Sequence, residues 1–529
     1  MKAIGFCLAA AGIDNCKVDF VAYSFDPWRR RLRAWSEDFP LSLVEGDYGT
    51  VTGETEFFNA TLAKESALRA LFPNAKFSYF EHHECHAASA FFSSPFDDAA
   101  VLVVDGIGES ATTWMGFGSG STIEPIAEIS YPDSLGFLWE KISEFVGFDP
   151  YDGPGKLMAL ARTCENNDCI ARFSDAFDSF VTIRSGNFSL DPIVCRFRER
   201  GCAGLEQAFR LKRESLDLGA IAALATVLQD TTEKILRCLA DSLWKTLNGS
   251  ALITSRLCLA GGVALNCVAN QALASSSSWE DMWVQPAAND AGTAIGAAQL
   301  AWYRCLAKTS RVEMLSPYLG PSYTSNECED ALLRAGLAAR KPACPSRYVA
   351  EQLAAGATVA WFQGRMEWGP RALGNRSILA SPSDRRFREV LNSQTKGREA
   401  FRPFAPAIPC DRLHEYFNGN TSDMRLRRFM LTTLNASALA REVAPAALHN
   451  QGGGLPDTAR VQSVDRAISP LFAELLTEFG SLTGVPILLN TSFNIGEPIV
   501  ASPGDACRTF IASSLDCMVL GPYVVERRR

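Results

Sequence analysis

The chain has 529 residues, which is too many for a single hydrophobic core and predicts two or three domains. Its composition, 47% hydrophobic and 21% charged, is typical of a globular protein and excludes an intrinsically disordered chain. The formal net charge of -8 argues against a general nucleic-acid-binding protein, which is usually basic.

Neither a targeting signal nor a membrane span is expected in this chain. The first residues, Met1 to Leu8, lack the charged leader and long apolar run of a secretory signal. No later run reaches the roughly 18 apolar residues that cross a bilayer. Sixteen cysteines occur without a CxxC pair, and the nearest two, Cys164 and Cys169, make a weak metal motif. We therefore expect a cytoplasmic protein with reduced thiols rather than a disulfide framework.

In chain order, helices are expected first and then an antiparallel meander of strands. Residues 1 to about 90 look mainly helical, and Ala60 to Leu71 has apolar residues at helical spacing. The apolar run Ala99 to Val104 predicts a strand that ends at a Gly-rich turn. Ala111 to Phe117 and Ile123 to Ser130 would be the next two strands of the meander.

An alternation of strands and helices follows the long helical stretch from Leu216 to Leu247. Predicted strands at Leu252 to Leu259 and at Met282 to Val284 each lead through a Gly-containing turn into a helix. This order implies an α/β domain that binds ligands at its strand ends.

A second α/β region is expected in the C-terminal part of the chain. Residues from about 307 to 345 show few signals and are interpreted as a connector. Thr358 to Phe362 predicts the first strand of the second region, and Val485 to Leu489 predicts a later one.

Three of the five histidines lie within five residues of one another: His82, His83 and His86. On a helix, His82 and His86 share one face and can bind one metal ion, whereas His83 would point elsewhere. Two satisfied histidines of the core or surface remain the alternative, because short motifs have a high false-positive rate.

Two aspartates strengthen the metal interpretation. Asp105 lies where a predicted strand meets a Gly-rich turn, and Asp290 lies at a second corner between strand and helix. Two imidazoles and two carboxylates would suit iron, zinc or manganese. A helix cap is the alternative role, for Asp290 especially.

The segment Leu259 to Asn266 predicts a strand, a glycine pair and the start of a helix. A helix N-terminus favours anions, and Gly261 and Gly262 would let a nucleotide lie on the backbone. A tight turn that needs positive φ is the alternative, and it would be preferred for an isolated glycine pair.

A basic segment from Arg365 to Arg402 predicts an anion site, because arginine matches phosphate oxygens in bidentate geometry. Its nine cations are Arg365, Arg371, Arg376, Arg385, Arg386, Arg388, Lys396, Arg398 and Arg402, against four acids, Glu367, Asp384, Glu389 and Glu399. The segment is therefore +5 (nine minus four), which leaves -13 for the remainder of a chain of -8. A solvated helix face is the alternative and fits Asp384 to Glu389 well. It fits Gly369 to Arg376 poorly, because that stretch reads as a turn-rich loop.

Together these motifs resemble the O-carbamoyltransferase family of the NodU, CmcH and TobZ type, in family order over nearly the whole chain. In the first half the similar segments are His82–Ala87, Asp105–Glu109, Ser134–Gly136, Gly155–Met158, Gly261–Asn266 and Asn289–Gly292. In the second half they are Gly364–Gly374, Phe401–Pro406, Thr458–Gln462 and Leu489–Asn494.

The resemblance implies a mixed α/β protein of two domains. Residues 1–325 would form an actin-like (Kae1-like) carbamoyltransferase domain, and residues 345–529 a YrdC-like domain. The second domain would make carbamoyl adenylate from carbamoyl phosphate and ATP. The first would pass the carbamoyl group to a hydroxyl of a small molecule, such as an antibiotic or another secondary metabolite, or a sugar.

The resemblance also implies site residues and cofactors. The ligands of Fe(II) or another divalent transition metal would be His82, His86, Asp105 and Asp290, and Mg would accompany ATP. The nucleotide site of the first domain would be lined by Gly262, Val263 and Asn266. In the second domain the catalytic cations would be Lys396, Arg371 and Arg402, with Arg460 and Asn490 binding carbamoyl phosphate and nucleotide. A homodimer is compatible with this family, whereas nucleic-acid and membrane partners are not expected.

One departure from the family pattern concerns the first residues. The actin-like domain should open with a β-hairpin, yet Ala3 to Ala11 reads as the helix after that hairpin, and Val18 to Ser24 as the next strand. The chain is therefore expected to lack the first strands, whose loop would lie near the acceptor and phosphates. A truncated, inactive actin-like remnant that still binds nucleotide and metal, or an ATPase, is the alternative function. Threonylcarbamoyl transfer to tRNA is disfavoured by the acidic balance.

Overall fold

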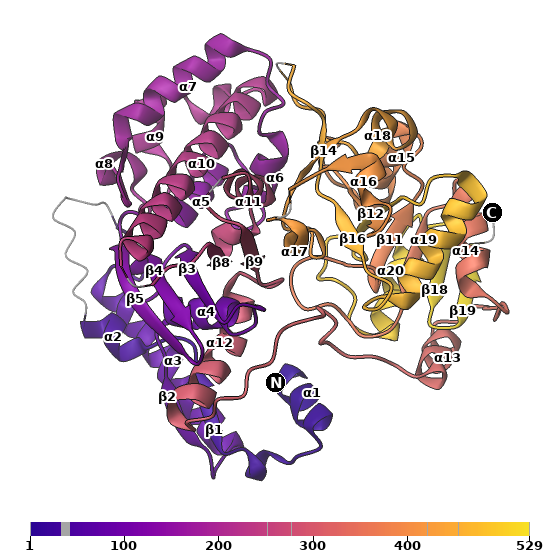
Figure 1. Cartoon of the computed structure of the whole chain (residues 1–529), viewed down its shortest axis with the longest axis horizontal. Coiled ribbons are helices and arrows are strands. Elements are labelled where there is room, and N and C mark those ends of the chain that lie inside the picture. Colours follow the sequence, from indigo (N-terminus) through magenta and orange to yellow (C-terminus); the bar gives the residue numbers. More distant parts are fainter. Residues whose placement is uncertain are drawn as a thin grey trace. The chain divides into compact units, whose positions relative to one another are not determined.

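The computed structural model describes residues 2–32, 43–250, 252–276, 278–420, 422–452 and 454–527. These fall into two compact units, Met1–Met314 and Leu315–Arg529, each with its own sheet and helices (Figure 1). Both units mix helices with strands, which confirms the mixed α/β class. The actin-like and YrdC-like assignments, and the domain bounds that go with them, stay predictions.

A five-stranded sheet, in the order β5-β4-β3-β8-β9, forms the centre of the N-terminal unit. Its strands are β3 (Asp98–Val104), β4 (Ala111–Ser119), β5 (Thr122–Ser130), β8 (Arg256–Ala260) and β9 (Asp281–Val284). The first three pair antiparallel, whereas β8 pairs parallel with β3, and β9 parallel with β8. The predicted meander and the strand at Met282 to Val284 are therefore confirmed, whereas the strand expected at Leu252 to Leu259 begins instead at Arg256. The central strand β3 is buried from Ala99 to Val104, as its continuous apolar run requires.

Helices and two small strand pairs complete the N-terminal unit. The α-helices of this unit are α1 (Lys2–Ala11), α2 (Pro27–Leu32), α3 (Val51–Leu71), α4 (His82–Phe91), α5 (Leu135–Phe145), α6 (Gly153–Leu160), α7 (Asn167–Phe180), α8 (Pro192–Cys195), α9 (Ala203–Phe209), α10 (Leu218–Asn248), α11 (Cys267–Ala274) and α12 (Thr293–Leu300). The strand pairs are β1 (Phe20–Tyr23) with β2 (Lys76–Tyr79), and β6 (Val181–Arg184) with β7 (Asn187–Leu190). The expected helices at the positions of α1, α3 and α10, and the expected strand at β1, are confirmed.

A seven-stranded mixed sheet, in the order β16-β12-β17-β11-β10-β18-β19, forms the centre of the C-terminal unit. Its strands are β10 (Val359–Phe362), β11 (Arg376–Ala380), β12 (Ala405–Pro409), β16 (Gln462–Val464), β17 (Leu488–Ser492), β18 (Cys517–Leu520) and β19 (Tyr523–Glu526). The prediction of β10 is confirmed. The strand expected at Val485 to Leu489 begins instead at Leu488, because Pro486 has no N–H to donate to a ladder.

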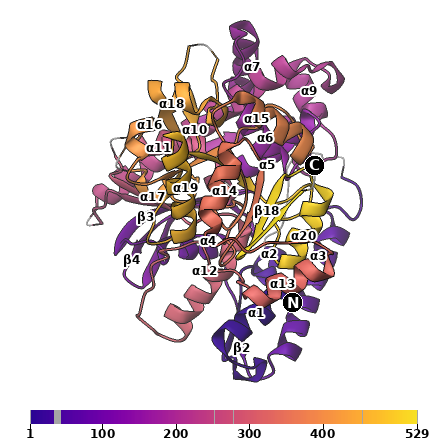
Figure 2. The same ribbon diagram turned by 90° about the vertical axis from the view of Figure 1, so that its right-hand side faces the viewer.

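Helices cover both faces of the C-terminal sheet. Helices α14 (Pro345–Ala354) and α19 (Pro470–Thr483) lie side by side in both views and share an apolar cluster with one sheet face (Figures 1 and 2). Helices α13 (Ser325–Arg334) and α20 (Pro503–Ala512) contribute to a second cluster on the other face. The shorter elements are α15 (Arg385–Val390), α16 (Leu413–Tyr416), α17 (Met424–Arg427), α18 (Ala438–Val443), β13 (Phe417–Asn418), β14 (Leu434–Ala436) and β15 (Thr458–Ala459).

The interpretation of residues 307–345 as a connector was incomplete, because this segment contains α13. Thr324 and Glu327 form a capping box at the start of that helix, with the Thr324 side chain accepting from Glu327 N at 3.3 Å. That pattern is a sequence signal for a helix N-terminus.

Two further findings concern the cysteines and the length of the apolar helices. All sixteen cysteines are free thiols, and nine of them are exposed or partly exposed. Within the described ranges, no helix has the length and apolar character to cross a membrane.

Candidate active site

Helix α4, which carries His82 and His86, is held at both ends by charged side chains. Its first backbone N–H, that of His82, donates to both oxygens of the buried Glu109 carboxylate at 3.2 Å. At the other end, the Arg311 guanidinium donates to the carbonyl oxygens of Phe91 and Phe92 and lies over the Phe91 ring. A negative group at the N-terminus and a positive group at the C-terminus match the helix dipole.

Helix α12 packs directly on α4 and brings Asp290 to the two histidines. Asp290 lies in a 3₁₀ turn, Asp290–Gly292, that leads into α12. The contact is close because Gly296 has no side chain. A Cβ there would overlap the carbonyl oxygen of Cys85 and lie 3.0 Å from the backbone nitrogen of Ser89.

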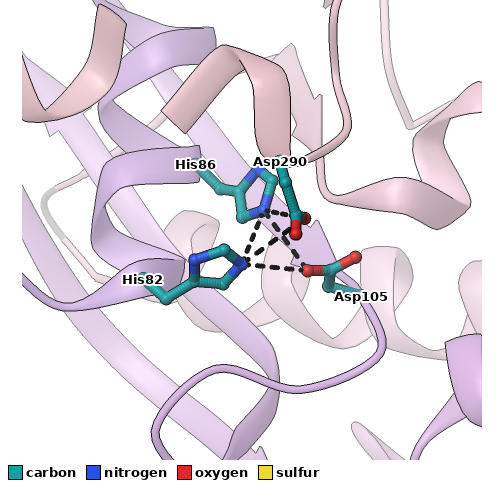
Figure 3. Close-up of side chains that lie close together, drawn as sticks. All are labelled: His82, His86, Asp105 and Asp290. Atoms are coloured by element: carbon teal, nitrogen blue, oxygen red, sulfur yellow. Dashed lines mark hydrogen bonds and ion pairs between the residues drawn. The ribbon is translucent and has the colours of Figure 1, made fainter. Parts of the chain in front are cut away.

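The four predicted metal ligands converge on one point (Figure 3). His82 Nε2 lies 3.2 Å from Asp105 Oδ2 and 3.2 Å from His86 Nε2, and His86 Nε2 lies 3.3 Å from Asp105 Oδ2. Asp290 Oδ1 lies 3.6 Å and 3.7 Å from the same two nitrogens. The side chain of His86 is fully buried, whereas that of Asp290 is 76% exposed, so the cluster opens to solvent on the Asp290 side.

These separations fit a single bound cation. Ligand nitrogens and oxygens about 2.1 Å from one tetrahedral ion lie about 3.4 Å from each other. The observed values of 3.2–3.7 Å span that distance. Two imidazole Nε2 lone pairs that point at the same position do not attract each other, so a proton or a cation must lie between them for a favourable interaction.

The pKa values of the cluster residues also indicate a cation site. Burial alone would lower the pKa of His82, but its bonds to Asp105 and Asp290 outweigh burial and raise that pKa to about 10. Burial opposes the ionised form of Asp105, yet His82 and His86 hold its pKa well below the usual range. The two carboxylates therefore attract a cation, and a metal ion would displace the proton from His82.

His83 does not join the cluster, as the helical spacing predicted. It is 2% exposed, and burial followed by the charge of His82 lowers its pKa to about 3, so it stays neutral. Its ring fills the space beside Gly108, where a Cβ would lie 2.7 Å from His83 Nδ1. His83 is thus a packing residue.

Neighbouring backbone groups orient the ligands. The Nδ1 of His82 lies 3.2 Å from the Ser24 carbonyl oxygen, which fits a proton on Nδ1 and a lone pair on Nε2. Asp105 accepts a bond from Gly262 N at 2.8 Å through Oδ1, which leaves Oδ2 for the cluster. The Gly-Gly turn is therefore joined directly to the candidate metal centre.

The predicted nucleotide contacts of this turn have structural roles as well. Gly261 has φ +88°, and a Cβ there would lie 2.6 Å from the Val104 carbonyl carbon, so the turn requires glycine. Asn266 accepts from Ala269 N at 3.0 Å as a helix cap and donates to Gln229 at 2.8 Å. Both polar atoms of Asn266 are thus already bonded, and Val263 is 8% exposed.

In the C-terminal unit, Glu367 shapes the loop that carries Arg371. Its Oε1 accepts bonds from the backbone nitrogens of Leu373, Asn375 and Arg376 at 2.8, 2.7 and 3.1 Å. Glu367 is only 6% exposed, so these bonds are shielded from water. Sequence reasoning counted Glu367 only as a charge and missed this role.

Asn490 and its neighbour Gln462 hold the same loop from the sheet side. Gln462 donates to the Leu373 carbonyl at 2.6 Å, and Asn490 donates to Gln462 at 2.7 Å and to the Ala372 carbonyl at 3.3 Å. The backbone on the C-terminal side of Arg371 is therefore fixed by side chains of β16 and β17.

The nine cations of the basic segment divide into different roles. Arg376 is fully buried, donates to the Gln363 carbonyl at 2.6 Å, and lies 3.7 Å from the Phe362 ring centroid, so it belongs to the fold. Arg386 is exposed and pairs with Asp384, as expected of a solvated helix face.

Lys396 is the most deeply placed of the predicted catalytic cations. It is 9% exposed, and its Nζ donates to the Ser492 carbonyl, to the Asn494 carbonyl at 2.8 Å and to Asn494 Oδ1 at 2.7 Å. Burial, followed by the charges of Arg398 and Arg402, lowers its pKa to about 7. Arg402 is partly exposed and lies 3.8 Å from Glu399, and Arg460 directly follows β15.

Comparison with known proteins matches both units to one family. The chain matches the description "Carbamoyltransferase N-terminus" over residues 1–299 and "Carbamoyltransferase C-terminus" over residues 350–527. The chain belongs to the carbamoyltransferase family. It is accordingly a carbamoyl-transferring enzyme, and it acts on a carbamoyl donor and an acceptor.

Relatives of this carbamoyltransferase align over nearly its whole length. An uncharacterized protein of Synechocystis is 34% identical over 99% of this chain and 90% of its own. The nodulation protein NolNO of Sinorhizobium fredii is 32% identical over 100% of this chain and 74% of its own. Among solved structures, HypF of T. kodakarensis is 14% identical with a TM-score of 0.28, covering 49% of this chain and 44% of that protein, which is too distant to support any inference.

Proposed function

We propose that the protein is an O-carbamoyltransferase. It makes carbamoyl adenylate from carbamoyl phosphate and ATP, and it passes the carbamoyl group to a hydroxyl of a small molecule, either a secondary metabolite such as an antibiotic or a sugar. The observation that carries the proposal is the convergence of two histidines and two aspartates in a chain of the carbamoyltransferase family.

In this proposal the actin-like N-terminal unit performs the transfer. His82, His86, Asp105 and Asp290 hold Fe(II) or another divalent transition metal. When bound, such an ion supplies Lewis-acid polarisation of a carbonyl or phosphate oxygen. Gly262, Val263 and Asn266 border the nucleotide, and the Asp105 carboxylate keeps the Gly262 turn in register with the ligands.

The YrdC-like C-terminal unit forms the adenylate in this proposal. Lys396, Arg371 and Arg402 offset the negative charge of carbamoyl phosphate and of ATP, which binds with Mg. Arg460 and Asn490 complete the binding of both substrates. The Nδ2 group of Asn490 is used by the loop, but its buried Oδ1 has no hydrogen-bond partner among the described residues. That oxygen is suited to accept a hydrogen bond from the amide of the carbamoyl group.

The testing experiment is pyrophosphate release from ATP by the purified chain without an acceptor. The proposal expects release that requires carbamoyl phosphate. Release of inorganic phosphate from ATP without carbamoyl phosphate would instead support the ATPase alternative. No turnover by a folded protein would support the inactive remnant.

A further inference from the structure

Helix α5 begins directly against the backbone of the metal-ligand turn. Ser134, its N-cap, donates to the Gly106 carbonyl at 2.6 Å, and Gly136 N donates to the Asp105 carbonyl at 3.3 Å. A Cβ at Gly136 would lie 2.6 Å from Gly106 N and 2.7 Å from the Asp105 carbonyl carbon. The face of α5 that contains Gly136 is therefore pressed onto Asp105.

Glu140 lies on the same face, one helical turn further along. Residues four apart share a helix face, and helical side chains lean back towards the N-terminus. Glu140 therefore belongs to the face of α5 that packs against the Asp105 turn. It is half-buried, and in the described parts of the chain it has no hydrogen-bond or ion-pair partner.

The charges around Glu140 come from the candidate metal centre. Burial, followed by the negative charges of Asp105 and Asp290, raises the pKa of Glu140 to about 7. Around the neighbouring helices α6 and α10, Lys156 pairs with Asp152 at 3.2 Å, and Arg162 pairs with Asp230 at 3.1 Å and with Glu233 at 2.7 Å. The adjoining 3₁₀ turn, Gly262–Leu265, has no charged residue.

We propose that Glu140 binds the acceptor hydroxyl beside the candidate metal centre and takes its proton during carbamoyl transfer. The inference rests on the proposed function. In that step the acceptor oxygen forms a bond to the carbamoyl carbon, and the bond from that carbon to the adenylate phosphate oxygen breaks. AMP leaves with the electron pair, and the hydroxyl proton ends on a Glu140 oxygen.

This assignment also restricts the acceptor. A divalent cation balances the charges of Asp105 and Asp290, which leaves the charge of Glu140 facing the acceptor. A neutral or cationic hydroxyl compound, such as an amino sugar, is favoured over an anionic one.

The test compares Glu140→Gln with the matched control Glu144→Gln on the same helix. Glu144 pairs with Lys141 at 3.0 Å and is not placed at the site. AMP release is measured against pH with ATP and carbamoyl phosphate, with water and then glycerol as the hydroxyl donor. Because a base must be deprotonated, release by the wild type and by Glu144→Gln should rise with pH. In Glu140→Gln it should fall by about 100- to 1000-fold and lose that pH dependence.

A second measurement keeps the inference testable without turnover. In the protein loaded with Co²⁺, a visible absorption change with pH should be present in the wild type and in Glu144→Gln, and absent in Glu140→Gln. The same titration in all three proteins would overturn the role of Glu140. Failure of the wild type to bind Co²⁺, or to release pyrophosphate, would overturn the proposed function itself and the inference with it.

Discussion

Replacing Gly296 by alanine should separate helix α12 from helix α4 and so weaken the candidate metal centre. The added Cβ would overlap the Cys85 carbonyl oxygen and lie 2.7 Å from its carbon and 3.0 Å from Ser89 N. Carbon atoms in contact normally lie about 3.5–4.0 Å apart, so the two helices must part by about 1 Å. Neither neighbour can yield by a side-chain rotation, because both are backbone atoms.

The magnitude follows from this displacement. Overpacking of a buried contact costs about 1–3 kcal/mol, and the backbone clash places Gly296→Ala at about 3 kcal/mol. Asp290 precedes α12, and its oxygen already lies 3.6 and 3.7 Å from the two histidine nitrogens. A further 1 Å would take both distances well beyond the roughly 3.4 Å that separates two ligands of one tetrahedral ion. We therefore expect metal affinity to fall by about 10- to 100-fold.

The assay is competition of the protein with a chelator for Co²⁺ or Zn²⁺, together with thermal unfolding. Gly155→Ala is the matched control, because Gly155 lies in helix α6 and a Cβ there would meet nothing within 4 Å. That control should keep its metal affinity and unfold at the same or a slightly higher temperature. Unchanged metal affinity in Gly296→Ala would refute the view that this helix contact positions Asp290.

The remaining predictions concern both units. His86→Ala should weaken metal binding at least 100-fold and block carbamoyl transfer while sparing pyrophosphate release, and equal transfer by variant and wild type would contradict its role as a ligand. Lys396→Ala should abolish carbamoyl-phosphate-dependent pyrophosphate release, whereas Lys341→Ala, the matched control, should retain it. Glu367→Ala should cost about 3 kcal/mol or more in the free energy of unfolding, because three buried backbone N–H groups lose their acceptor. The pKa of Lys396 is lowered from 10.5 to about 7, so the unfolded chain binds more protons between those values. The free energy of unfolding of the wild type, measured against Lys396→Met, should therefore rise with pH across that window by up to ~1.4 kcal/mol per pH unit, and a flat difference would contradict the lowered pKa.

Local elements followed from the sequence because their signals are local. The continuous apolar run of Ala99–Val104 predicted β3, and helical spacing predicted most of α10. The misplaced start of β17 had a local cause as well, since Pro486 excludes the residues before Leu488 from the ladder.

The metal centre was only half determined by sequence. The spacing of His82 and His86 places both rings on one helix face, as found. Whether Asp105 and Asp290 join them depends on how the β3 turn and α12 pack against α4, which no spacing along the chain contains. The role of Glu140 likewise follows from the contact of Gly136 with the Asp105 turn, and only the fold reveals that contact.

For the basic segment, the sequence determined the concentration of charge, and the tertiary structure decided what each charge does. Arg376 is buried among carbonyl oxygens, Arg386 is exposed beside Asp384, and Lys396 is held by the Asn494 loop. Each of these three residues adds one positive charge to the same segment, but they differ in exposure to solvent and in their partners. Arg386 has a partner two residues away, whereas Lys396 is bonded to Ser492 and Asn494, which only the folded structure brings to it.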